Sequence, residues 1–71
     1  MTQHVITVVC GSNPEIDEAA FLAAKLQEAG LVADFRPAVS MVYAIEVIPV
    51  GNQYREAIKQ EFRNAGFECP D

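Results

Sequence analysis

The residues best suited to chemistry are two carboxylates and an arginine within apolar stretches of the chain. Asp34 and Arg36 stand two positions apart, and Glu46 lies in the middle of the most apolar segment. Paired carboxylates can perform acid–base catalysis, but they need a cleft that excludes water. A chain of 71 residues has little room for such a cleft. We therefore expect a non-catalytic protein, in which Glu46 faces water or pairs with Arg36 on the neighbouring strand.

Two other places have residue types that bind ligands. His4 is the only histidine, and it has no second histidine or cysteine at ligand spacing, so we expect no metal site. The loop at residues 10–14 lies before a predicted helix N-terminus, where anions bind. Glu15, Asp17 and Glu18 follow at once, and their negative charge disfavours a phosphate there. We interpret this loop as an ordinary helix start and expect no cofactor.

The overall charge narrows the class of partner. Ten acidic residues against five basic ones give a net charge of −5, and no basic run exists. Nucleic acids and anionic membranes are therefore poor partners, because lysine and arginine dominate binding to both. Residues 1–71 have room for a single domain, and the half-apolar composition is typical of a folded one.

The two cysteines, Cys10 and Cys69, are too few for a disulfide framework. Cys10 ends an apolar run and is interpreted as a small buried side chain, while Cys69 near the C-terminus is left open as exposed or as paired with Cys10. The N-terminus lacks the pattern of a signal peptide, and no apolar run reaches membrane-spanning length. We expect the reduced cytoplasm as the location.

The elements that would position these residues follow from periodicity and from two helix stops, Gly30 and Gly66, which end similar segments. Asn13 is the predicted cap of the first helix. The predicted strands cover residues 5–10, 31–36 and 41–48, with a turn at 37–40. The predicted helices cover residues 14–29 and 53–65. Residues 68–71 suffice for the stub of a fourth strand. This βαββα(β) order predicts an α+β, two-layer, ferredoxin-like sandwich, with an antiparallel sheet and both helices on one face.

The face of this sheet away from the helices is the predicted partner-binding surface. Alternation assigns Ile6, Val8, Ala33, Phe35, Tyr43, Ile45 and Val47 to the helix side. The opposite face is apolar except for three charges, and apolar surface marks interaction sites. Its predicted members are Val5, Thr7, Val9, Val32, Asp34, Arg36, Val42, Ala44, Glu46 and Ile48. The weak fourth strand also predicts an open edge beside the first strand.

The order of elements resembles that of small regulatory domains of ferredoxin-like type, including ACT domains that sense amino acids. The leading hypothesis is a small acidic protein-binding module, a homodimer that acts as an inhibitor or adaptor of the kind found in phages. The alternatives are an ACT-like regulatory domain that binds a small molecule, and a structural subunit of an assembly. Fold resemblance alone does not choose among them.

Overall fold

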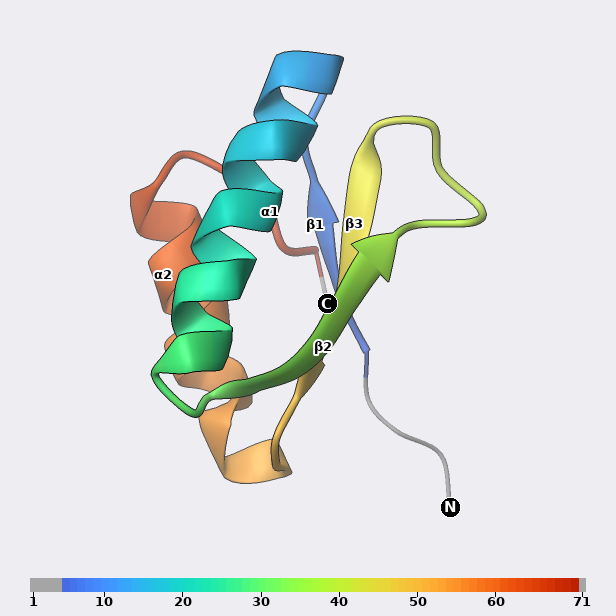
Figure 1. The fold of residues 1–71 in the computed structure, drawn as a ribbon. Helices are drawn as coiled ribbons and strands as arrows, with labels where there is room; N and C mark the ends of the chain where they lie inside the picture. The colour runs from blue at the N-terminus through green and yellow to red at the C-terminus, as the bar shows by residue number, and fades with distance from the viewer. Residues whose placement is uncertain (1–4, 71) are drawn as a thin grey trace.

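The computed structural model describes residues 5–70, which form a three-stranded antiparallel sheet and two α-helices (Figure 1). This confirms the predicted α+β class. The strands lie in the order β1-β3-β2, so the strand that comes last in the sequence occupies the centre. The elements are β1 (Ile6–Val9), α1 (Asn13–Glu28), β2 (Val32–Pro37), β3 (Ala44–Pro49), the short 3₁₀ helix η1 (Asn52–Tyr54) and α2 (Arg55–Asn64).

Helix α1 begins one residue earlier than predicted, and its cap is Ser12. The extended Ser12 accepts a hydrogen bond at Oγ from the Glu15 backbone N–H, with 3.4 Å between the two atoms. Asn13, the predicted cap, is instead the first helical residue. Serine and asparagine are comparable caps, so their neighbourhood allowed either choice. The buried residues of α1 are Ala19, Ala23 and Leu26, which recur at helical spacing on one face.

Both helices end at the predicted glycines. Gly30 has φ +90° and Gly66 has φ +97°, a left-handed conformation that side chains rarely adopt. After each glycine the next backbone N–H reaches back five residues, from Leu31 to Leu26 and from Phe67 to Phe62. These bonds satisfy carbonyls that the helix end leaves free. Each stop also brings an apolar side chain back onto its helix.

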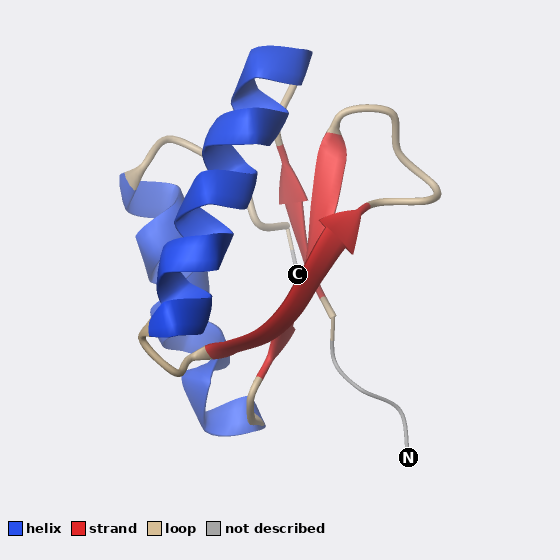
Figure 2. Cartoon of the chain, in the orientation of Figure 1, coloured by secondary structure: helices blue, strands red, loops and turns tan. Residues whose placement is uncertain are grey.

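The hairpin between β2 and β3 is longer than predicted. β2 extends to Pro37 and β3 begins at Ala44, so residues 38–43 form the connection (Figure 2). The Ala38 N–H donates to the Ala44 carbonyl at 3.0 Å and closes the loop. Residues 41–43 were assigned to the strand on their apolarity, but ladder pairing with β2 stops at this closing bond. Tyr43, predicted to face the helices, is partly exposed.

A β-bulge early in β2 reverses two side-chain assignments. Val32 pairs with Pro49 and Asp34 with Ile48, so β2 carries an extra residue between these two pairs. Val32 consequently joins the buried core, although alternation from Asp34 placed it on the opposite face. Ala33, expected against the helices, is exposed. A bulge moves the side chains that precede it to the other face, because alternation has a period of two.

The core joins the two helices to the strands. α1 packs on β2 and β3, α2 packs on β1, and the two helices touch each other. The fully buried Phe62 of α2 meets Phe67 edge to face, with ring centroids 6.1 Å apart. After Phe67 the chain reaches the outer edge of β1, where Val9 and Glu68 form an isolated antiparallel bridge. The predicted fourth strand is therefore this one bridge within residues 5–70.

Candidate functional site

The candidate surface is the outer face of the sheet, defined here as the side chains of Thr7, Val9, Asp34, Arg36, Ala44, Glu46 and Ile48. The register places Thr7 opposite Glu46 and Val9 opposite Ala44 across β1 and β3. Since Ile6, Val8, Ile45 and Val47 belong to the core, the residues that alternate with them point away from it. Val5, which precedes β1, is half-buried, as are Thr7 and Val9.

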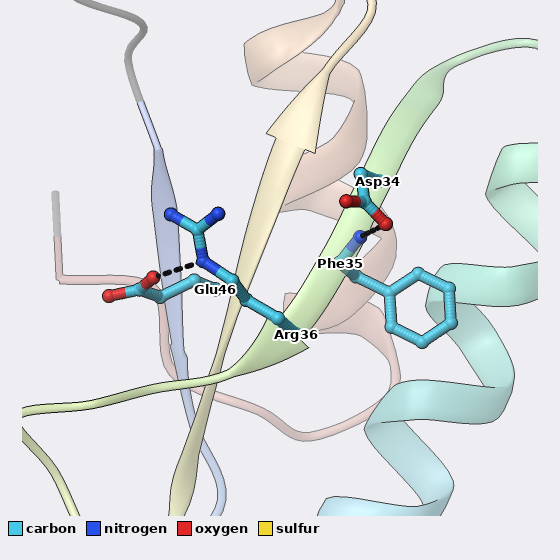
Figure 3. Close-up of polar contacts among 4 residues, drawn as sticks. All are labelled: Asp34, Phe35, Arg36 and Glu46. Atoms are coloured by element: carbon cyan, nitrogen blue, oxygen red, sulfur yellow. Dashed lines mark hydrogen bonds and ion pairs between the residues drawn. The ribbon is translucent and has the colours of Figure 1, made fainter.

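An ion pair crosses the outer face between the two predicted partners. The Nε atom of Arg36 donates to Oε1 of Glu46 at 2.9 Å, and the register sets these residues directly opposite each other (Figure 3). The Arg36 side chain is half exposed and that of Glu46 about one fifth exposed. An ion pair with this much exposure to solvent contributes roughly 0.2–1 kcal/mol to the stability of the fold. The pair neutralises Glu46, so the centre of the outer face has no net charge.

The apolar part of the outer face is narrower than the sequence predicted. Ala44 is 1% exposed and Ile48 is 8% exposed within the single chain. Val32 faces the core, and Val42 lies in the β2–β3 loop rather than on the sheet. The accessible apolar residues of the predicted set are therefore Val5 and Val9, on β1 and its approach, together with Val42 in the loop; the uncharged Thr7 lies between the first two.

Apart from Val42, sequence reasoning missed a denser group of apolar side chains in the β2–β3 loop, residues 38–43. Val39 is 93% exposed and Val42 is 83% exposed, and Met41 and Tyr43 are also exposed. No charged residue occurs between Pro37 and Ile45. The sequence did contain a signal for this loop. Residues 37–43 show no alternation of polar and apolar residues, and such alternation is expected of a half-buried strand.

The outer edge of β2 is protected against pairing with another strand. Nε2 of Gln27, on α1, donates to the Ala33 carbonyl at 2.9 Å. Two positions along, the Phe35 backbone N–H donates to the Asp34 carboxylate at 2.8 Å (Figure 3). Pro37, the next residue on this edge, has no N–H to offer. Asp34 thus uses its carboxylate to cap an edge, which is a structural role.

This protection gives a testable expectation for the double variant Gln27→Ala/Asp34→Ala. The two backbone groups become free for intermolecular pairing, so we expect faster aggregation on shaking, with little change in the helical circular dichroism. Light scattering and a fibril-binding dye measure the rate. Gln60→Ala, which removes an exposed glutamine that bonds Asn64 within α2, is the matched control. Equal aggregation rates for the double variant and wild type would refute the capping role.

The outer edge of β1 is occupied differently. The Val9 N–H donates to the Glu68 carbonyl at 2.9 Å, and Nη2 of Arg63 holds the Cys69 carbonyl at 3.2 Å. Residues 68–70 therefore lie where an added strand would pair. A partner that adds a strand here has to displace them, so the outer face and the loop are the better candidates for binding.

Both thiols are buried in the core, and neither forms a disulfide. Burial raises the pKa of the Cys10 thiol, and the nearby Glu15 carboxylate raises it further. A thiol with a raised pKa stays protonated at neutral pH and is a weak nucleophile. Cys10 is buried, as predicted from the apolar run, and Cys69 is buried rather than exposed.

Residues 5–70 contain no group of three or more histidine, cysteine or acidic side chains arranged to hold a metal ion. His4 lies outside the described residues. In the same range, no helix has both the length and the apolar character needed to span a bilayer. No protein-family model, curated protein or solved structure matches this chain.

Proposed function

We propose that this protein is a small acidic protein-binding module without catalytic activity, which acts through the outer face of its sheet and the adjoining β2–β3 loop. The observation that carries the proposal is the gathering of exposed apolar side chains in an uncharged loop, next to a sheet face with a neutralised centre. Exposed contiguous apolar surface favours contact with another macromolecule. An inhibitor or adaptor that covers a surface of a larger protein is the role that fits this size.

The fold within this proposal is the ferredoxin-like plan, with both helices on one face of the sheet. Two observations support it. Residues 68–70 lie beside β1 in the place of a fourth strand, which would give the spatial order 4-1-3-2. The side chains that contact the helices alternate with those of the outer face along β1 and β3. This arrangement would leave the outer face free of helices.

Self-association is the simplest use of the outer face. Val5, Thr7 and Val9 carry no charge, so two copies can bring them together without opposing like charges. A core of this size supplies only about 3–5 kcal/mol of stability, and association commonly adds to it in small domains. We therefore propose a homodimer in which these residues of the two copies face each other.

The double variant Thr7→Lys/Val9→Lys tests the homodimer. We expect wild type to sediment as a dimer at micromolar concentration and the variant as a monomer, because four lysines would meet in each dimer interface. The helical circular dichroism should persist, since both positions are half-buried on the outer face. Val50→Lys, at a valine that is 55% exposed beyond β3, is the control and should leave the dimer intact. A monomeric wild type at all concentrations would refute the homodimer.

A further inference from the structure

The β2–β3 loop is a convex apolar tip on a fixed base. Its base is closed by the hydrogen bond from Ala38 to Ala44, and the Tyr43 carbonyl accepts from the backbone N–H groups of Cys10 and Gly11 at 2.9 and 3.4 Å. The β1–α1 turn therefore holds the return of the loop. A loop fixed in this way loses less conformational entropy on binding than a free one. A fixed loop with exposed apolar side chains is suited to contact an apolar surface of a partner.

Negative charge lies at the same end of the molecule. The β1–α1 turn that holds Tyr43 leads directly into Glu15, Asp17 and Glu18, which are exposed on the first turns of α1. Residues 11–24 contain no lysine or arginine to neutralise them. In Figure 1 the first turns of α1 and the β2–β3 loop both lie at the upper end of the molecule. This end therefore combines an apolar tip with an acidic flank.

From these two features we infer that the β2–β3 loop, with Val39 and Val42 at its tip, packs against an apolar surface of another protein that is bordered by lysine or arginine. The apolar surface removes the valine side chains from water, and the basic border meets the carboxylates of α1. The inference rests on the proposed function as a binding module, and it adds the chemistry of the partner.

The negative charge near the loop also favours this basic partner over a second copy of the protein or an anionic membrane. A second copy meeting the loop with the same end would bring three more carboxylates toward Glu15, Asp17 and Glu18, so like charges would oppose each other. An anionic membrane surface would be repelled for the same reason. The β2–β3 loop is thus expected to bind a basic partner, and the adjoining outer face around Thr7 a second copy.

The probe for this inference is a synthetic amphipathic helix of leucine and lysine, which presents an apolar surface with a basic border. We expect it to shift the backbone NMR signals of the loop and of the first turns of α1 in labelled protein. A helix of the same design with glutamate in place of lysine should bind at least about tenfold more weakly, which corresponds to about 1.4 kcal/mol. Added salt should weaken the first complex.

Matched variants separate the apolar contribution from the electrostatic one. Val39→Ser/Val42→Ser changes no charge and should weaken binding of the leucine–lysine helix about tenfold or more, while Val50→Ser, an exposed valine outside the loop, should not. Asp17→Asn/Glu18→Gln should weaken binding and reduce its salt dependence, whereas Glu28→Gln at the far end of α1 should do neither. The variants carry surface changes, and circular dichroism checks that each remains folded.

Several results would overturn the inference. The first is that the leucine–lysine helix shifts only the NMR signals of α2, or none, or that the glutamate helix binds equally well. The second is that the loop variants and their controls have equal effects. The third is that the loop serves another partner, shown by self-association of the protein that depends on Val42 or by binding to phosphatidylcholine vesicles through the loop. The homodimer is tested independently at Thr7 and Val9. A negative result for the loop therefore does not refute the homodimer, and a monomeric wild type does not refute the inference about the loop.

Discussion

Replacement of Phe62 by alanine is expected to unfold the protein. Phe62 has no exposed surface, and its ring packs edge to face on Phe67 with an interplanar angle of 70°. Truncating a buried phenylalanine costs about 3–5 kcal/mol, from lost burial and from the cavity that remains. A core of this size contributes about the same amount in total. The loss should therefore abolish the cooperative unfolding transition in urea that wild type shows by circular dichroism.

The control for this prediction is Phe21→Ala on α1. Phe21 is 67% exposed, and the ammonium of Lys25 lies over its ring, 5.3 Å from the centroid. An exposed contact of this kind contributes about 0.5–1 kcal/mol, so the variant should keep a transition close to that of wild type. Similar stabilities for Phe62→Ala and Phe21→Ala would contradict the position of Phe62 at the centre of the core.

The helices were the most predictable part of the fold, because their signals are local. The stripe that contains Ala19 and Ala23 repeats at helical spacing, and Gly30 and Gly66 stand where the chain needs a left-handed residue. Each signal depends only on residues within one or two turns. The choice of Ser12 over Asn13 as cap was beyond such rules, because both side chains suit that position.

The sheet was less predictable, because its register depends on residues distant in the sequence. The ion pair of Arg36 and Glu46 was predictable from alternation, since Arg36 lies in the part of β2 that follows the bulge and Glu46 lies opposite it on β3. The hairpin closure at Ala38 and Ala44 was not, because apolar residues continue through the loop. Residues 41–43 of the exposed loop were therefore assigned to a strand, whereas Val39 fell in the predicted turn at residues 37–40.

Because of the bulge in β2, an aspartate should have very different effects on stability at two adjacent positions, 32 and 33. Val32 is 2% exposed in the core, and the neighbouring Ala33 is exposed. An aspartate at position 32 would lose the burial of a valine, about 1.5–3 kcal/mol, and would place an unpaired carboxylate in the core. We expect Val32→Asp to be unfolded at neutral pH, since the whole core supplies only about 3–5 kcal/mol.

Ala33→Asp is the matched variant, with the same new side chain one residue away. Ala33 is exposed and bonds Gln27 through its backbone carbonyl alone, so a change of its side chain should alter stability by about 0.5 kcal/mol or less, and this variant should unfold in urea near wild type. Uninterrupted alternation from Asp34 predicts the opposite order, with Val32 on the outer face and Ala33 against the helices. A stable Val32→Asp together with an unfolded Ala33→Asp would therefore show that β2 has no bulge.

The pH dependence of the two variants gives an independent check on where each carboxyl lies. Burial disfavours the charged form, so the pKa of an aspartate at position 32 would be raised in the folded state above its unfolded value of about 3.9. The electrostatic penalty is then fully present above the folded pKa and disappears as the pH falls through it toward the unfolded value. Stability relative to wild type should thus rise on acidification for Val32→Asp and stay nearly constant for Ala33→Asp. Urea unfolding of all three proteins at several pH values measures this difference, and parallel pH profiles for the two variants would place both carboxyls in water.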